Sequence, residues 1–349
     1  MGTVISGSPR DAFGAEFAGA EGFLDTATYG VPPRFVADAL RDCVQLWEQG
    51  TLDVSTFAEP MSASRAAYAS LVGVDAGRVA MGTSVSSLIG LVAASIPDGA
   101  RVATMLGEYT SVTFPFAAQA DRGVTVTELP SGVFEDAAGD FDVVAVSLVQ
   151  SADGRVLDVE SLRRSVAESG TVTVIDAVQA LGWKNVELSW ADVAVAASYK
   201  WLLGPRGVAW MSLSDRMFGA LVPHGANPFA SEDLWSSLYG LPLRLASDAR
   251  RFDSSPAWFS VLGAGLSLAW IASLDRAAVE AHTVGLANRL RSELALAPAD
   301  SAIVSIPVAH AAEALQKAGI RASVRAGAAR VCFHLYNTES DLDRVIDAL

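Results

Sequence analysis

Short apolar segments recur along the middle of the chain at spacings that predict a β-sheet. Seven runs are rich in β-branched residues or alanine, and they are RVAMGT (78–83), RVATML (101–106), VTVTEL (124–129), DVVAVSLV (142–149), VTVIDA (172–177), DVAVAAS (192–198) and GVAWMSL (207–213). Most of the segments between them are long enough for a helix or another crossover. Nearly continuous apolar strands joined by crossovers are typical of a mostly parallel sheet covered on both faces. We therefore predict an α/β fold with a mostly parallel, seven-stranded sheet.

The segments on either side of these strands predict helices. Residues 32–50 and 62–74 have helical spacing, and in the first of them Pro33 lies near the start and Gly50 just past the end. Residues 259–294 look like one long helical stretch.

The C-terminal part predicts a second, smaller unit. After a loop-rich region it alternates strand, helix, strand and helix, which suits a small α+β domain. We predict a large domain over residues 23–250 and a small domain made of residues 1–22 and 251–349.

Composition narrows the class of protein. The chain has 349 residues and a net charge of −14, with no run of Lys or Arg, which argues against a nucleic-acid partner. No stretch reaches the ~18 apolar residues of a membrane span, and the N-terminus has no apolar leader. The two cysteines, Cys43 and Cys332, are far apart, so we expect neither a disulfide framework nor a metal site. The expected location is the cytoplasm.

Polar residues gather where the predicted strands end, which is where parallel sheets bind ligands. Lys200 follows a buried strand, so its amine must be paired, exposed or chemically used. Asp176 closes the strand before it, and Gln179 comes three residues later, on the same side of a helical turn. Each residue also has an ordinary interpretation, because Lys200 alone suits a solvated loop and Asp176 alone suits a helix cap.

Together these residues match the requirements of a pyridoxal 5'-phosphate (PLP) site. The lysine forms a Schiff base with the cofactor aldehyde, and the carboxylate keeps the ring nitrogen protonated so that the ring can accept electrons. Gly82-Thr83-Ser84 opens a predicted helix, whose free N–H groups and hydroxyls suit a phosphate, although such a segment is also an ordinary cap. Tyr109 could stack on the cofactor ring, and its ordinary interpretation is a tyrosine on the surface.

Several motifs carry a resemblance to a known family. MGTS, GEYTS, IDAVQA, SYKWLLGPRG and RVCFHLYNTESDLDRV resemble, in order and spacing, the class V aminotransferase family of fold-type I PLP enzymes. That family includes cysteine desulfurases, kynureninase, isopenicillin N epimerase and the ergothioneine-pathway lyase. The similarity runs from FLDTATYGVPP to the C-terminus, and it implies a large PLP-binding domain with a small α+β C-terminal domain.

The resemblance also implies roles for individual residues. Lys200 is expected to be the Schiff-base lysine, Asp176 the pyridinium partner and Gln179 the donor to the phenolic oxygen. Arg330, just ahead of VCFHLYNT, is expected to clamp the substrate α-carboxylate. The further expected contacts are Thr83, Ser84, Ser198 and Tyr199 around the cofactor, Tyr109 over its ring and Thr26 near the substrate. Members of the family are usually homodimers with the active site at the interface, and Ser255 would then reach the phosphate of the partner chain.

Departures from the family pattern narrow the chemistry. The segment IRASVRAGAAR has no cysteine where desulfurases present a nucleophile, and Cys332 lies in an apolar strand, so we expect no persulfide chemistry. SYK is nearer to kynureninase, and YKWLLGP to the epimerase-like and lyase-like members. The first expectation is therefore β-elimination from a cysteine S-conjugate or a related β-substituted amino acid.

Other functions stay open from the sequence alone. An aminotransferase is the second expectation after β-elimination, and a decarboxylase or an epimerase is a further alternative. A non-catalytic relative of the fold conflicts with the intact lysine, aspartate and arginine. A nicotinamide-binding enzyme conflicts with the absence of G-x-G-x-x-G after the first predicted strand.

Overall fold

A computed structural model describes residues 9–349, and its centre is a seven-stranded sheet. The strands stand in the order β3 (Val79–Gly82), β9 (Ala209–Leu213), β8 (Val193–Ala197), β7 (Val172–Asp176), β6 (Val143–Ser147), β4 (Arg101–Met105) and β5 (Thr125–Leu129). Only β9 runs antiparallel to its neighbours, and every other pair is parallel. The predicted α/β fold and all seven predicted strands are confirmed.

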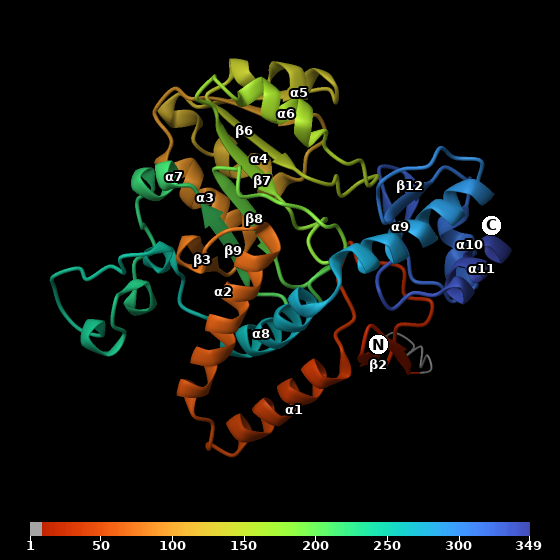
Figure 1. Cartoon of the computed structure of the whole chain (residues 1–349), viewed down its shortest axis with the longest axis horizontal. Coiled ribbons are helices and arrows are strands. Elements are labelled where there is room, and N and C mark those ends of the chain that lie inside the picture. The colour runs from red at the N-terminus through yellow and green to blue at the C-terminus, as the bar shows by residue number, and fades with distance from the viewer. Residues whose placement is uncertain (1–8) are drawn as a thin grey trace.

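Alternate side chains of the strands enter two separate cores. In β8, Ala194 and Ala196 belong to one core, whereas Val193 and Val195 belong to the other. This period of two explains why the strands read as nearly continuous apolar runs. The first core is covered by α2 (Ala58–Val72), α5 (Val133–Ala137), α6 (Val159–Val166) and α8 (Trp258–Ser273), and the second by α3 (Val85–Ser95), α4 (Thr110–Ala117) and α7 (Asp215–Ala220). The sheet therefore lies between two helical layers (Figure 1).

A smaller unit with its own core lies beside the sheet (Figure 1). It contains the antiparallel strands β10 (Ile303–Ile306), β12 (Ala328–Cys332) and β11 (Ser323–Arg325), in that order, with helices α9 (Arg276–Glu293), α10 (Ala311–Lys317) and α11 (Glu339–Ala348). Leu290, Val331 and Leu342 are among its buried residues. A hairpin of β1 (Arg10–Ala12) and β2 (Ala15–Phe17) is tied to α11 by the ion pair of Arg10 with Asp341.

The long helical stretch predicted over residues 259–294 is two helices. The chain bends by 93° between α8 and α9, where the Asp275 carboxylate accepts hydrogen bonds from the N–H groups of Ala277 and Ala278 and caps α9. Among the residues that the structure describes, no single helix is long and apolar enough to cross a membrane, and α8 and α9 pass that test only as this bent pair.

Helix α8 packs against α1 (Arg34–Glu48) and α2, and Val261 and Leu268 belong to the core of the large sheet. Apart from Leu24, the residues of the small unit's core begin later in the sequence, at Leu286 of α9. The domain boundary at residue 250 stays a prediction. The first eight residues of the predicted 1–22 segment lie outside the described residues.

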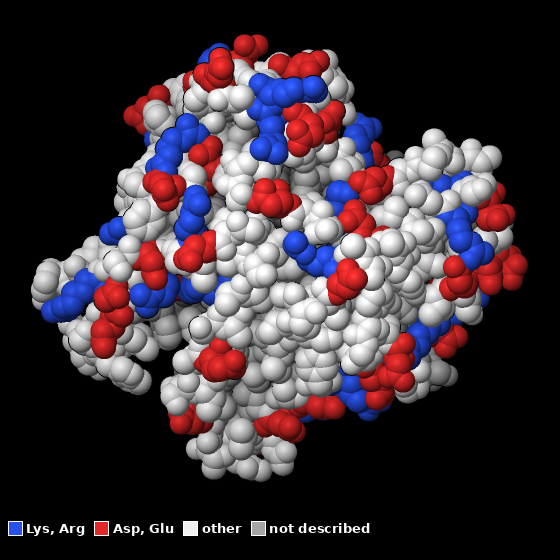
Figure 2. Space-filling model, viewed as in Figure 1, with Lys and Arg blue, Asp and Glu red and all other residues white. Residues whose placement is uncertain are grey.

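The remaining ordered elements are short. They are the 3-10 helices η1 (Val54–Phe57), η2 (Ala76–Arg78), η3 (Ala120–Arg122), η4 (Ala138–Asp140), η5 (Pro228–Ala230), η6 (Trp235–Ser237) and η7 (Ala249–Phe252). The segment that holds η5 and η6, between α7 and α8, projects from the body of the molecule as an arm (Figure 1). Figure 2 shows Lys and Arg side chains interspersed with Asp and Glu on the same face.

Candidate active site

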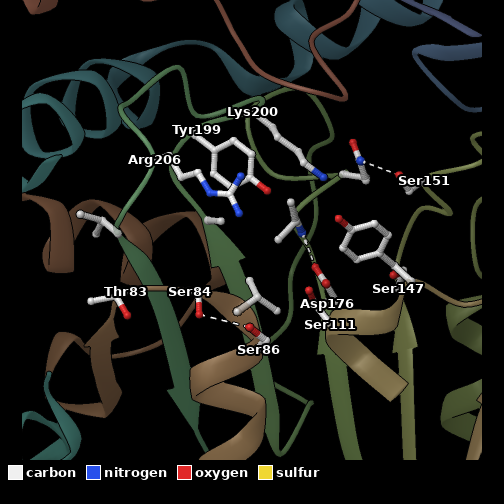
Figure 3. A pocket seen from close by; sticks show the side chains of 16 residues that line it. Thr83, Ser84, Ser86, Ser111, Ser147, Ser151, Asp176, Tyr199, Lys200 and Arg206 are labelled. Atoms are coloured by element: carbon white, nitrogen blue, oxygen red, sulfur yellow. Dashed lines mark hydrogen bonds between the residues drawn. The ribbon is translucent and has the colours of Figure 1, made fainter. Parts of the chain in front are cut away.

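A cleft opens beyond the carboxyl ends of the parallel strands, as the sequence predicts. Its empty space is about 650 Å³ when the open solvent at its mouth is included. Strands β3, β6, β7 and β8 deliver most of its polar residues directly or from the next turn. The lining residues are Thr83, Ser84, Val85, Ser86, Tyr109, Ser111, Ser147, Ser151, Asp176, Val178, Gln179, Ala197, Tyr199, Lys200, Arg206 and Val208 (Figure 3).

Lys200 is buried in this cleft, and its amine lacks a hydrogen-bond or ion-pair partner in the part of the chain that the structure describes. Only 6% of the residue is exposed, and within residues 9–349 its amine has no hydrogen-bond acceptor and no ion pair. Its Nζ faces the ring of Tyr109 at 5.3 Å and that of Tyr199 at 5.7 Å from the centroids. Burial lowers the pKa of Lys200, and the nearby Asp176 carboxylate opposes that change. A buried amine without a partner is costly unless it is used chemically.

Among the described residues, no other lysine combines burial with an unpaired amine as Lys200 does. The sequence has three lysines in all. The Nζ of Lys184 pairs with Glu280 at 3.0 Å and with Asp300 at 2.5 Å, and Lys317 is exposed on α10. Lys200 is therefore the one lysine that is both buried and free to bond a cofactor.

The backbone around Lys200 is held by close contacts. The N–H of Gly30 donates to the carbonyl of Tyr199 at 2.9 Å, and a Cβ at position 30 would lie 2.2 Å from the Lys200 carbonyl oxygen. Only glycine fits at that distance. The N–H of Leu203 donates to the Lys200 carbonyl at 3.2 Å, which closes the turn after the lysine. The N-terminal segment and the turn thus fix the place from which the amine enters the cleft.

Asp176 ends β7 and keeps part of its hydrogen-bonding capacity free. Its Oδ1 accepts from the N–H of Val178 at 2.8 Å, and no other hydrogen bond to this carboxylate is made within the described part of the chain. Burial raises the pKa of Asp176 and the Glu108 carboxylate raises it further, whereas the Val178 N–H and the Lys200 amine lower it. A protonated ring nitrogen would both use the free oxygen and favour the charged form.

Gln179 is oriented by a residue that the sequence analysis did not single out. The indole N–H of Trp201 donates to Gln179 Oε1 at 2.8 Å. An indole can only donate, so the amide oxygen must face Trp201 and the amide NH₂ must face the other way. That NH₂ donates to the carbonyl of Ala27 and to Ser151 Oγ, both at 3.1 Å. A donor is therefore aimed at the side of the cleft where Ser151 lies (Figure 3).

Glu108 anchors the ends of two strands behind the cleft. Its carboxylate accepts from the N–H and hydroxyl of Ser147 at 2.8 and 2.6 Å, from Gln150 Nε2 at 2.8 Å and from the N–H of Tyr109 at 2.7 Å. Four bonds to one buried carboxylate fix where Tyr109 enters the cleft. The sequence signal for this residue is its place after β4, next to the tyrosine.

The start of α3 forms one wall of the cleft. Ser84 Oγ accepts from the N–H of Ser87 at 3.1 Å, so this hydroxyl caps the helix. The N–H groups of Val85 and Ser86 have no partner inside the helix, as at every helix start, and the Thr83 hydroxyl is exposed beside them. Free N–H groups and hydroxyls at a helix N-terminus suit an anion such as a phosphate.

Four of the predicted site residues, Ser198, Thr26, Ser255 and Arg330, do not line this cleft. The Ser198 hydroxyl is buried and donates to the carbonyl of Pro205, within the lysine loop. The Thr26 hydroxyl is buried 2.5 Å from the Tyr336 hydroxyl. Ser255 is exposed and lines a separate small cavity, which Thr83 also borders.

Arg330 also lies behind the cleft rather than in it. It is 1% exposed, and its Nη2 lies 3.5 Å from the Asp25 carboxylate. Its guanidinium also donates to Ser323 Oγ, to the carbonyl and hydroxyl of Ser151 and to Thr28 Oγ1. It reaches the cleft only through its hydrogen bonds to Ser151. To bind the substrate carboxylate as predicted, its guanidinium would have to give up one of its present hydrogen bonds.

The donor set fits PLP. Lys200 supplies a buried amine without a partner, Asp176 a carboxylate with a free oxygen, and the start of α3 an anion site, while Tyr109 supplies an aromatic face. Within the described ranges, no group of three or more His, Cys, Asp or Glu side chains is arranged to hold a metal ion.

Comparisons with known proteins point to the same chemistry. Residues 55–311 match the family described as aminotransferase class V. An uncharacterized aminotransferase, YcbU, of Bacillus subtilis is 26% identical over 309 residues, covering 82% of each chain. The isopenicillin N epimerase of Streptomyces clavuligerus is 28% identical over 335 residues, covering 82% of this chain and 83% of the epimerase.

Solved structures share the fold at lower identity. The cystine C-S lyase C-DES, in complex with its product cysteine persulfide, has a TM-score of 0.82 at 17% identity and covers 94% of this chain and 96% of its own. The apo cysteine desulfurase of Thermococcus onnurineus has a TM-score of 0.79 at 19% identity, with 93% and 92% covered.

Proposed function

The chain belongs to the class V aminotransferase family and is a PLP-dependent enzyme, and we propose that it catalyses β-elimination from a cysteine S-conjugate or a related β-substituted amino acid. PLP supplies an electron sink for the charge that remains when a bond to the amino acid's α-carbon breaks. The observation that carries the proposal is the buried, unpaired Lys200 amine in a cleft that contains no thiol.

Lys200 is the base that takes the proton from the α-carbon. Its lowered pKa keeps a usable fraction of the amine neutral near pH 7, which a base requires. Asp176, which lines the cleft, would hold the cofactor's ring nitrogen in its protonated form. The Gln179 NH₂ would exchange its bond to Ser151 for one to the phenolic oxygen. Tyr109 would cover one face of the ring.

The fate of the sulfur follows from the cysteines. The chain has only Cys43 and Cys332, both buried and neither among the residues that line the cleft. Burial raises the pKa of the Cys332 thiol to about 11, so it is a poor nucleophile. Transfer of the sulfur to the protein, as a persulfide on an enzyme cysteine, needs a cysteine that attacks the substrate sulfur, and none lines this cleft. Sulfur is therefore expected to leave as a free thiol.

The proposed reaction balances without an oxidant. The Cα–H bond gives its proton to Lys200 Nζ, its electron pair forms the Cα–Cβ double bond, and the Cβ–S bond breaks to release a thiolate. The thiolate takes up one proton. Water then hydrolyses the released enamine to pyruvate and ammonia.

Arg330 is the residue that we expect to bind the substrate carboxylate. Two of its present partners, Ser151 at the cleft wall and Thr28, are uncharged acceptors, and a carboxylate is a stronger, bidentate acceptor for a guanidinium. An incoming amino acid is therefore expected to displace one of these contacts. The Asp25 carboxylate would stay as the buried counter-charge.

The test is product analysis with an S-alkyl cysteine. The PLP-loaded wild type is expected to release pyruvate and thiol in equal amounts, and Lys200→Ala to release neither. Cys332→Ala is the matched control, and we expect it to keep the activity because no thiol takes part. Formation of alanine with sulfur held on the protein would contradict the proposal.

An aminotransferase is the second candidate, because the YcbU relative, which covers 82% of the chain, bears that name. The same lysine would then move the α-proton without breaking the Cβ–S bond. Production of a 2-oxo acid that retains its sulfur, dependent on an added acceptor 2-oxo acid, would favour this candidate over elimination.

We also propose that the enzyme works as a homodimer in the cytoplasm. The arm between α7 and α8 exposes Tyr239 and Leu241 by 87% and 88%, and Leu106 and Phe114 are exposed as well. Burying such side chains against a second copy would stabilise the pair. Ser255, which lies outside its own chain's cleft, would then be free to reach the partner's phosphate. A monomer by light scattering at micromolar concentration would contradict the dimer.

A further inference from the structure

The cleft contains a second cation, for which the sequence analysis gave no role. Among the residues that line it, the cations are Lys200 and Arg206. Lys200 is committed to the cofactor aldehyde, which leaves Arg206. We propose that Arg206 binds the phosphate of PLP, together with the start of α3.

The position of Arg206 suits this role. In Figure 3 its guanidinium lies next to Tyr199, on the side of the cleft where Thr83, Ser84 and Ser86 stand, whereas Asp176 and Ser147 stand on the other side. Its Cζ lies 5.2 Å from the centroid of the Tyr199 ring. Stacking on an aromatic ring restricts a guanidinium while leaving its N–H groups free in the plane.

The backbone that carries Arg206 is fixed. The Arg206 carbonyl accepts from Ser260 Oγ of α8 at 2.8 Å, and the N–H of Gly204 donates to the Ser198 carbonyl at 2.9 Å. Gly207 follows with φ +116°, a conformation that favours glycine. The loop that carries Lys200 therefore also sets where Arg206 stands. One rigid turn would hold the cofactor at both ends, by its aldehyde and by its phosphate.

The guanidinium of Arg206 is free to bind an anion. Within residues 9–349 it makes no ion pair and donates no hydrogen bond, whereas other arginines such as Arg65 and Arg216 are paired with carboxylates. An unpaired arginine in a chain of net charge −14 is available for an incoming anion. A second feature of the same cleft also points to a ligand, because the buried Lys200 amine has no partner there.

A phosphate needs more positive charge than the helix supplies. A phosphate monoester carries about −1.5 to −2 charges at pH 7, and a helix N-terminus offers roughly +0.5. The hydroxyls of Thr83 and Ser84 are neutral, and that of Ser84 already caps the helix. A bidentate guanidinium supplies the missing charge in a geometry that matches phosphate.

The test compares PLP with pyridoxal, which lacks the phosphate. The full chain, freed of cofactor by dialysis, is titrated with each compound, and binding is followed by quenching of tryptophan fluorescence. We expect Arg206→Gln to weaken PLP binding by about 10- to 100-fold, as loss of a charged hydrogen bond does, and to leave pyridoxal binding unchanged. Arg206→Lys should retain part of the PLP affinity, because it keeps the charge without the planar fork.

Arg163 offers a matched control, since its guanidinium lies 5.7 Å from the ring centroid of Trp190, outside the cleft. Arg163→Gln is expected to bind both compounds like the wild type. An equal loss of PLP and pyridoxal in Arg206→Gln would overturn the proposal, because Arg206 would then act through the shape of the loop. Unchanged PLP binding would overturn it as well. This inference rests on the PLP cofactor, and a wild-type chain that bound neither compound would contradict the cofactor itself.

Discussion

The pKa of Lys200 gives the sharpest quantitative prediction, because it decides how much of the amine is reactive at neutral pH. Burial lowers this pKa from its ordinary 10.5 to about 8. At pH 7 a lysine with the ordinary value has roughly 0.03% of its amine neutral, whereas a pKa of about 8 leaves roughly 10% neutral. The neutral amine is the form that attacks an aldehyde. The neutral fraction of Lys200 at pH 7 is thus about 300-fold that of an ordinary lysine, and covalent attachment of PLP should be faster by up to that factor.

The assay follows the rate of PLP attachment to the cofactor-free chain between pH 6.5 and pH 10, by the growth of a visible absorption band. The rate should rise with pH and level off above a midpoint near 8. Asp176→Asn provides the internal test, because the Asp176 carboxylate raises the pKa of Lys200 and its loss should move the midpoint to lower pH. A midpoint near 10.5, or a shift to higher pH in Asp176→Asn, would refute the reasoning.

Three further predictions follow from other contacts around the site. Gly30→Ala puts a Cβ 2.2 Å from the Lys200 carbonyl oxygen, so thermal or denaturant unfolding should show a loss of about 1–3 kcal/mol in the free energy of unfolding, with slower PLP attachment. Trp201→Phe leaves Gln179 Oε1 buried without its donor, and we expect a loss of about 1–3 kcal/mol in the same measurement together with an altered absorption band of bound PLP. Cys332 should react with a thiol reagent at pH 8 only after the protein is unfolded, because its thiol is buried and its pKa is raised to about 11.

Each of these predictions has a control or a contrary result. Gly90 lies on α3, and a Cβ added there would meet no heavy atom within 4 Å, so Gly90→Ala should be neutral or slightly stabilising. Equal stability of the Gly30 and Gly90 variants would contradict the contact with the lysine loop. An unchanged band in Trp201→Phe would show that the indole does not orient Gln179. Rapid labelling of Cys332 in the folded protein would contradict its burial.

The sheet could be predicted from sequence because six of its seven strands are buried on both faces, the exception being the edge strand β5. Such strands are continuous apolar runs that end at a polar residue, and β7 with its terminal Asp176 shows the pattern clearly. The break between α8 and α9 was missed, although Asp275 is a recognisable N-cap, because the apolar pattern continues across it. Strands β1, β2 and β11 have three residues each, too few to show a period of two.

The site could be predicted only where local sequence carries the chemistry. Lys200, Asp176 and Gln179 stand at the ends or turns of neighbouring strands, so their convergence follows from the parallel topology. The orientation of Gln179 depends on Trp201, 22 residues away, and no spacing rule places that indole. Arg206 lies within the quoted motif, but only the conformation of the turn shows that its side chain enters the cleft.

Other residues were placed by contacts that the sequence does not reveal. Thr26 and Arg330 belong to segments that meet only in the folded chain, through Tyr336, Thr28 and Ser151. Their roles toward a substrate stay predictions.

The central claim is that Lys200 holds PLP in this cleft, and peptide mapping tests it most directly. The chain has three lysines, so borohydride reduction of the PLP-loaded protein, followed by digestion and mass spectrometry, leaves little room for ambiguity. We predict that the adduct lies on Lys200 and that Lys200→Ala carries none. An adduct on Lys184 or Lys317, or a wild-type chain with no adduct after incubation with PLP, would contradict the account.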